Sequence, residues 1–188
     1  MKDAIQNCIN EHKKLIEAFE TDCIDSVAAA VDLLTDCFKA GGTVYLCGNG
    51  GSAADAQHVA GEFVGRLKHD KIALPAVALS VDCSVLTCVS NDYGFEEVFA
   101  RQIQALGRKG DVLWAFSTSG TSKNVLKAVD AAKSQGLKII GFVGRPDSPL
   151  EKLSDVCVGV DSQWSCGAQE VHQLAYHIIC DLVERTFT

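Results

Sequence analysis

The fold is decided by the stretch TVYLCGNGGS, residues 43–52. Its first half is a short run of β-branched, aromatic and aliphatic residues, which predicts a buried strand. Its second half is rich in glycine and ends at a serine, and a helix is predicted from there to about Arg66. A strand that leads through a glycine turn directly into a helix is typical of α/β proteins, in which the helix returns the chain to the next parallel strand.

The same succession recurs along the chain. DVLWAFS (111–117) predicts another strand, and a run of serine, threonine and glycine separates it from a helix over 123–134. Continuously apolar strands that alternate with helices indicate a parallel sheet covered on both faces. We therefore expect one doubly wound α/β domain over 1–188, with ligands at the carboxyl ends of the strands near the point where the strand order reverses. Further strands and helices are predicted, in chain order, over 75–80, 95–106, 138–143, 156–160 and 168–184.

The first 40 residues have a helical pattern. A second helix is predicted over 26–39, and it ends at a pair of glycines. These helices either pack on the domain or pair between subunits, and an apolar seam with no obvious partner in so small a domain favours pairing. The seam of the first helix has alternating spacings of four and three, as in a coiled coil, and consists of Ile5, Ile9, His12, Ile16 and Phe19.

Composition excludes several classes of protein. The net charge is −7 and there is no long basic run, which argues against a nucleic-acid surface. No apolar run approaches the roughly 20 residues that span a bilayer, and the first residues are polar, unlike a secretion signal. The nine cysteines form no C-x-x-C pair and most lie in apolar runs, so a reducing compartment is expected in place of disulfides or a cysteine zinc site. We expect a cytoplasmic protein without a membrane or nucleic-acid partner.

Two loops have the composition of phosphate sites. In the glycine loop, 48–52, glycines let the backbone approach a ligand, and Ser52 could cap the helix that follows. In the serine loop, 117–122, five of six residues carry hydroxyls, which can surround a phosphate without lysine or arginine. Each loop alone could be an ordinary turn or helix cap, but the pair favours a phosphate site. Neither the Walker A pattern nor the dinucleotide fingerprint is present.

Acid–base and metal candidates lie on two predicted helices. His58 and Glu62, four residues apart, share a helix face that begins at the glycine loop. Both residue types ligate zinc and transfer protons near neutral pH, although a surface hydrogen bond is the alternative reading. For His172 we expect a satisfied core histidine or an interface network. The last helix carries polar residues in an otherwise apolar sequence, namely Gln169, Glu170, His172, Gln173 and His177.

The segment Asn91–Phe95 predicts a turn. It follows the strand predicted over 75–80. Asp92 suits either a sugar hydroxyl or a helix cap.

Four motifs in this order resemble a known family. CGNGGSAADAQHVAGEF, SNDYGFEEVFARQ, STSGTSKNVLKA and QEVHQLAYHIICDL look like the bacterial phosphoheptose isomerases of the sugar-isomerase (SIS) domain superfamily. The similarity covers essentially the whole chain. It implies a flavodoxin-like five-stranded sheet with added N-terminal helices, and a homotetramer with active sites at subunit boundaries. The implied reaction converts sedoheptulose 7-phosphate into D-glycero-D-manno-heptose 7-phosphate through an enediol, the first step toward the heptose of bacterial surface polysaccharide.

The resemblance also implies roles for individual residues. Glu62 would be the catalytic base and His177 the acid. One zinc ion per subunit is implied, with ligands at His58, Glu62, Gln169 and His177. Substrate-binding residues are implied at Asn49, Gly50, Gly51, Ser52, Glu62, Asn91, Asp92, Ser117, Thr118, Ser119, Ser122 and Gln169.

Two features of the sequence bear on the implied role of Gln169 as a zinc ligand. Gln169 and His177 are eight residues apart, about 12 Å along a regular helix, whereas Gln173 and His177 would be the easier pair of ligands. The chain also departs from the usual run Ala/Asp-Arg-Ile-Gln-Glu, because Gly167 stands where the family has arginine.

Two other functions compete with catalysis. Related SIS-domain proteins bind a replication initiator, and others sense a sugar phosphate without turnover. The initiator-associating group lacks the acidic residue and the last histidine, whereas this chain has both Glu62 and His177.

Overall fold

The computed structural model describes residues 1–188 and contains one five-stranded sheet. All neighbouring strands are parallel and lie in the order β2-β1-β3-β4-β5, so the predicted flavodoxin-like sheet is confirmed. The chain leaves β1 toward one edge and β3 toward the other, which places the reversal of strand order between these two strands. The strands are β1 Val44–Cys47, β2 Ala76–Ala78, β3 Val112–Ser117, β4 Lys138–Val143 and β5 Val156–Gly159.

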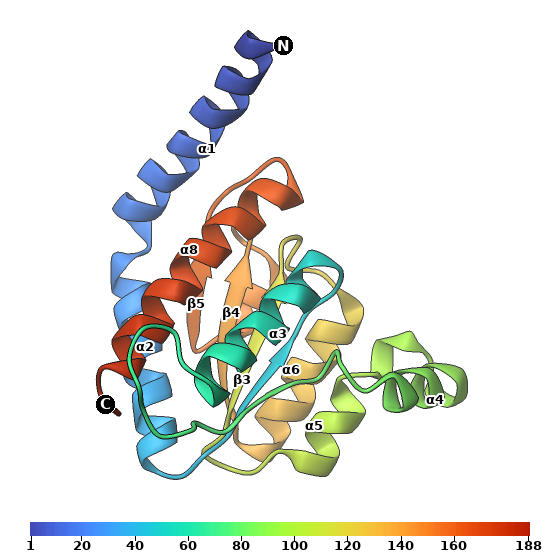
Figure 1. Cartoon of the computed structure of the whole chain (residues 1–188). Helices are drawn as coiled ribbons and strands as arrows, with labels where there is room; N and C mark the ends of the chain where they lie inside the picture. Colours follow the sequence, from blue (N-terminus) through green and yellow to red (C-terminus); the bar gives the residue numbers. More distant parts are fainter.

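Helices cover both faces of the sheet (Figure 1). Helices α2, α3 and α8 pack on one face, and α5 and α6 on the other. None of the helices combines the length and the hydropathy needed to cross a bilayer. The helices are α1 Lys2–Asp22, α2 Ile24–Lys39, α3 Gly51–Val64, α4 Cys83–Tyr93, α5 Ala100–Leu106, α6 Lys123–Gln135, α7 Pro149–Leu153 and α8 Ser165–Glu184, with a 3₁₀ turn, η1, at Phe95–Glu97.

Alternation along each strand divides the core in two. In β1, Val44 and Leu46 face the side of α3 and α8, while Tyr45 and Cys47 face α5 and α6. Because both faces are buried, the strands need no polar residues in alternate positions, which explains their continuous apolar runs.

An aromatic cluster fills the core under α3 and α8. The ring of Trp114 lies 5.5 Å from that of Phe116 and 5.1 Å from that of Phe142, and all three side chains are fully buried. Phe63 of α3 and Tyr176 of α8 pack against the same cluster. The two helices are thus fixed on the sheet by large side chains at their inner faces.

Helix α4 is the main departure from the sequence prediction. Asp82 caps its start by accepting a hydrogen bond from the Val85 amide at 3.0 Å, and Gly94, with φ 96°, ends it. Asn91 and Asp92 therefore lie in the last turn of a helix, and the prediction of a turn there is wrong. The β-branched residues of this stretch disfavour a helix by propensity, but packing of one helical face on the domain outweighs that preference.

Several boundaries also differ. The helix predicted over 95–106 is interrupted, because η1 and α5 are separate elements. The strand predicted over 75–80 has only three residues, Ala76–Ala78. The last helix begins at Ser165 instead of 168, and α7 was not expected.

Helix α1 projects from the domain (Figure 1). Ile5 and Ile9 in its outer turns are exposed, whereas Phe19 near its end is buried. Its middle lies on the start of α8. There Gly167 approaches Leu15 so closely that an added Cβ would be 2.9 Å from a methyl carbon of Leu15.

The segment between α3 and β2 is tied to the end of α8. The buried carboxylate of Glu184 accepts hydrogen bonds of 2.7, 2.8 and 2.6 Å from the backbone amides of Leu67, Lys68 and His69. Burial raises the pKa of Glu184, but these hydrogen bonds outweigh that effect and hold the pKa below its usual value. This contact fixes the end of α3 relative to α8.

The aromatic cluster generates a prediction about stability. Replacing Trp114 by alanine should lower the free energy of unfolding by about 3–5 kcal/mol, because it empties a large and fully buried site. Urea unfolding followed by far-ultraviolet circular dichroism measures this loss. The other tryptophan, Trp164, is 64% exposed, and its replacement by alanine should change the free energy by no more than about 0.5 kcal/mol. Equal losses for the two variants would contradict the prediction.

Candidate active site

The glycine loop forms a tight turn between β1 and α3. Gly50, with φ 57°, stands at the N-terminus of α3, and an added Cβ at Gly48 would lie 2.6 Å from the Ser52 carbonyl oxygen. Ser52 is already inside the first turn of the helix and is buried, so the prediction that it caps α3 is wrong. No side chain caps this end. The amides of Ser52 and Ala53 donate to the carbonyl oxygens of Asn49 and Gly50, at 3.0 and 3.1 Å, which leaves the amide of Gly51 available to an anion.

The serine loop is a cluster of hydroxyls at the start of α6. Ser117 Oγ donates to Ser122 Oγ at 3.0 Å and lies 3.4 Å from Ser119 Oγ. Ser119 Oγ also accepts from the amide of Thr121 at 3.2 Å. The hydroxyls thus satisfy one another. Ser122 at the N-cap of α6 makes no capping hydrogen bond, and of the first amides of this helix only that of Val125 has a side-chain acceptor, Asn124 Oδ1. Such a set can rotate its hydrogens to meet phosphate oxygens.

Because β1 and β3 pair in parallel, the two loops that follow them lie side by side at the carboxyl ends of the strands. The side-chain amides of Asn49 and Asn124 bond reciprocally across them, at 2.9 and 2.8 Å. Thr118 Oγ1 donates to Ser165 Oγ at 3.1 Å, which joins the serine loop to the first residue of α8. The N-terminal ends of α3, α6 and α8 therefore meet around the two predicted phosphate loops.

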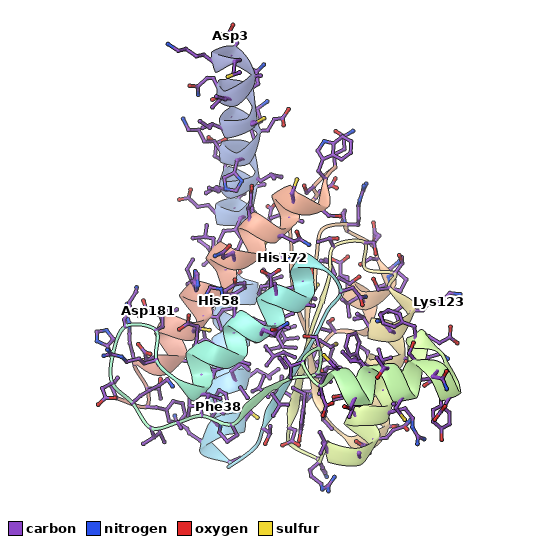
Figure 2. All side chains as sticks on the ribbon, turned by 45° about the vertical axis from the view of Figure 1, so that its right-hand side comes forward. Asp3, Phe38, His58, Lys123, His172 and Asp181 are labelled. Carbon is purple, nitrogen blue, oxygen red and sulfur yellow. The ribbon has the colours of Figure 1, made fainter.

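Three metal-ligating side chains converge between α3 and α8. Figure 2 labels one of them, His58, where the two helices lie side by side. His58 Nε2 lies 3.0 Å from Glu62 Oε1 and 3.3 Å from His177 Nε2. His58 and Glu62 share the expected face of α3, and the neighbouring α8 contributes His177. The structure thus brings together three of the four residues predicted to hold zinc.

Hydrogen bonds from Asp55 through Tyr176 to the Nδ1 side of the ring orient His58. The hydroxyl of Tyr176 lies 3.0 Å from His58 Nδ1 and donates a long hydrogen bond of 3.5 Å to Asp55 Oδ1. If the tyrosine proton points to the carboxylate, its oxygen accepts from Nδ1–H of His58. Nε2 then carries the lone pair that a metal ion between His58, Glu62 and His177 would require, whereas without an ion the 3.0 Å contact is a hydrogen bond that Nε2–H donates to Glu62 Oε1.

Burial shifts the pKa values around this cluster. It raises the pKa of Asp55 to about 6, an effect that the hydrogen bond from Tyr176 and the charge of His58 partly offset. Burial, followed by the nearby His58, lowers the pKa of His177. A neutral imidazole at neutral pH is the form that binds metal.

The remaining predicted residues lie in other places. The side-chain amide of Gln169 lies against Gly51, about 2.6 Å from where a Cβ would stand, so it covers the glycine loop. Helix α8 is already helical at Ser165, so no irregular start shortens the distance from Gln169 to His177. Asn91 and Asp92 are exposed on α4, at the outer edge of the domain, and are hydrogen-bonded to each other at 2.8 Å.

His172 is a core histidine, as expected. It is almost fully buried, and its Nε2–H donates to the carbonyl oxygen of Val143 at 3.1 Å. Burial lowers its pKa to about 4, so the ring is neutral and has a structural place beneath the end of β4.

A second cluster, His69, Asp181 and Glu184, also has the composition of a metal site. Its carboxylates already have partners, since Glu184 accepts three backbone amides and Asp181 pairs with Lys68 at 2.9 Å and Arg185 at 2.7 Å. The arginine and the lysine lower the pKa of Asp181 to about 2. We interpret this cluster as a set of structural contacts that hold the segment after α3 on the end of α8.

Sequence reasoning missed four side chains at the site: Asp55, Asn124, Ser165 and Tyr176. Asp55 precedes His58 by one helical turn, and Tyr176 is the neighbour of His177, so both share an element with a predicted residue. Asn124 stands next to the serine loop. The weak signal in each case was a polar or amphipathic residue within one turn of a candidate.

Comparison with known proteins agrees with this geometry. The SIS domain family matches residues 8–144. The phosphoheptose isomerase of Nitratiruptor sp. is 44% identical over 187 residues, which cover 100% of both chains. The structure of a phosphoheptose isomerase from Neisseria gonorrhoeae superimposes with a TM-score of 0.92 at 37% identity, over 98% of each chain. That of a phosphoheptose isomerase from Francisella tularensis gives 0.93 at 32% identity, over 97% of each chain.

Identity at this level over the full length, on the same fold, settles the relationship. The chain belongs to the phosphoheptose isomerase family of SIS-domain proteins.

Proposed function

We propose that the chain is an aldose–ketose isomerase that converts sedoheptulose 7-phosphate into D-glycero-D-manno-heptose 7-phosphate. The observation that carries the proposal is the convergence of His58, Glu62 and His177 beside two loops suited to a phosphate. The similar full-length proteins are phosphoheptose isomerases by name. A protein that only bound a replication initiator or sensed a sugar phosphate would give Glu62 and His177 no role.

The phosphate would bind at the serine loop. Free amides at the start of α3 and α6 favour an anion there, which compensates for the absence of a basic cluster in a chain of net charge −7. The proposed phosphate-binding residues are Ser52, Ser117, Thr118, Ser119 and Ser122. The proposed contacts to the rest of the substrate within one subunit are Asn49, Gly50, Gly51, Glu62 and Gln169. Asn91 and Asp92 are exposed on α4, so their proposed contact with the substrate would be made at a subunit boundary.

Isomerisation moves one proton between adjacent carbons. Glu62 would remove the proton from C1 of the ketose and return it to C2, through an enediol. His177 would supply a proton to the oxygen on C2 and later take one from the oxygen on C1, so that no proton is gained or lost. Glu62 has one oxygen, Oε1, directed at His58, which leaves Oε2 for proton transfer. Glu62 could thus ligate a metal ion through one oxygen and act as the base through the other.

The donor set fits zinc. Tetrahedral zinc with Zn–N bonds of about 2.0–2.1 Å separates its donor atoms by about 3.3 Å, and the two histidine nitrogens here are 3.3 Å apart. His58, Glu62 and His177 would hold the ion, three protein ligands being typical of a catalytic site. When bound, zinc would polarise the substrate oxygens and stabilise the developing negative charge. Gln169, the fourth ligand implied by the resemblance, would have to leave Gly51 to reach it, and its present place suits the substrate better.

A homotetramer in the cytoplasm that supplies heptose for bacterial surface polysaccharide completes the proposal. The exposed Ile5 and Ile9 on the projecting part of α1 support association through this helix, since their apolar seam continues into the buried Phe19.

Replacing Ile5 and Ile9 together by lysine should lower the molecular mass measured by light scattering, with little change in the fold because both side chains are exposed. An unchanged mass would place the interface elsewhere.

The catalytic assignment is tested by replacing Glu62 with glutamine. This change keeps the shape of the side chain but removes the base, so turnover of sedoheptulose 7-phosphate should fall at least about 1,000-fold while substrate still binds. Nuclear magnetic resonance in heavy water measures both turnover and deuterium incorporation at C2 of the aldose. Glu20→Gln, at an exposed position near the end of α1, is the matched control and should retain full activity. Normal activity of Glu62→Gln would refute the assignment.

The zinc site is tested by changing Tyr176, whose hydroxyl contacts the Nδ1 atom of His58. Tyr176→Phe removes the hydroxyl that lies 3.0 Å from His58 Nδ1 and leaves the ring in place. Zinc affinity should fall about 10- to 100-fold, because the imidazole loses the contact that fixes its tautomer. Competition with a chromophoric chelator measures the affinity without any need for turnover. Tyr93→Phe, on the exposed surface of α4, should bind zinc like the unmodified protein, and equal affinities for all three proteins would argue against the proposed orientation.

A further inference from the structure

Asn124 and Asn49 form a closed pair. Each side-chain amide donates to the oxygen of the other, at 2.9 and 2.8 Å, across 75 residues of sequence. Asn124 is 4% exposed, and its Oδ1 also accepts from the Val125 amide at 3.0 Å. Two hydrogen bonds in a planar arrangement fix both the distance and the orientation of the two side chains.

The pair connects the two loops of the proposed site. Asn49 belongs to the glycine loop, from which α3 begins, and Asn124 follows the serine loop in the first turn of α6. Beside the glycine loop the neighbouring Gly50 has open space, with no atom within 4 Å of an added Cβ. The amide pair is therefore the side-chain contact that ties this loop to the serine loop.

The choice of residue at 124 is not explained by the helix alone. Ser122 already holds the N-terminal position of α6, and asparagine inside a helix is less favourable than alanine by propensity. The Nδ2 group of Asn124 donates to Asn49 Oδ1. The bond from the Val125 amide accounts for Oδ1 within the helix, but the Nδ2 group of Asn124 has its partner only in the glycine loop.

We propose that Asn124 is a positioning residue that sets the distance between the phosphate-binding serine loop and the catalytic helix α3, acting through Asn49. This rests on the proposed function, in which the phosphate on C7 and the reacting carbons C1 and C2 lie at opposite ends of one substrate. The serine loop holds the first end, and Glu62 on α3 must reach the second. A displacement of about 1 Å between them costs about 100-fold in rate.

A double-mutant cycle tests the proposal. Asn124→Ala should lower kcat for sedoheptulose 7-phosphate about 10- to 100-fold, with the fold retained by circular dichroism. In a protein that already carries Asn49→Ala, the same change should lower kcat by less than about threefold, because the link is already broken. Losses that multiply would overturn the proposal, since Asn124 would then act on substrate or stability independently of Asn49.

A second measurement does not depend on turnover. In the substrate-free protein, ¹⁵N relaxation of the Gly50 and Gly51 amides should show increased motion in Asn124→Ala. Ser134→Ala, which removes a local hydrogen bond at the other end of α6, should leave these amides unchanged. An unmodified protein without isomerase activity would refute the proposed function alone, whereas unchanged motion of Gly50 and Gly51 in Asn124→Ala would refute the role of Asn124.

Discussion

The parallel hydrogen bonds between β1 and β3 determine where the site can form. Their register places Cys47 beside Ala115, so the loops that follow the two strands emerge at one edge of the sheet. Because the chain then turns to opposite sides, the loops diverge and leave the amides at the start of α3 and α6 facing the same space. The proposed binding of phosphate by hydroxyls and helix ends, in an acidic protein without a basic cluster, depends on this arrangement.

The second determinant is the packing of α3 against α8 on the aromatic cluster. Phe63 and Tyr176 fix the two helices on Trp114 and Phe116, and Glu184 holds the segment after α3 on the end of α8. With the helices set in this way, His58 and His177 meet without any strain in the backbone. Tyr176 has both roles, since its ring packs in the core while its hydroxyl orients His58.

Much of the fold could be predicted because its signals are local. Strand composition, the glycine turn and the spacing of His58 and Glu62 each lie within a few residues, and all are present in the structure as expected. The contributions of Tyr176 and Asn124 depend on contacts across 118 and 75 residues, which no local pattern contains. Helix α4 escaped prediction because its β-branched residues favour a strand, and only tertiary packing makes it helical.

Gly167 lies in α8 at its contact with α1. An added Cβ there would lie 2.9 Å from Cδ1 of Leu15 in α1 and 2.9 Å from Oγ of Ser162, so a larger residue at 167 would displace at least one of these side chains. The cost in stability of a larger residue at 167 should therefore be smaller in a protein in which Leu15 has been replaced by a smaller residue. The effect of a mutation at one of these positions thus depends on the residue at the other.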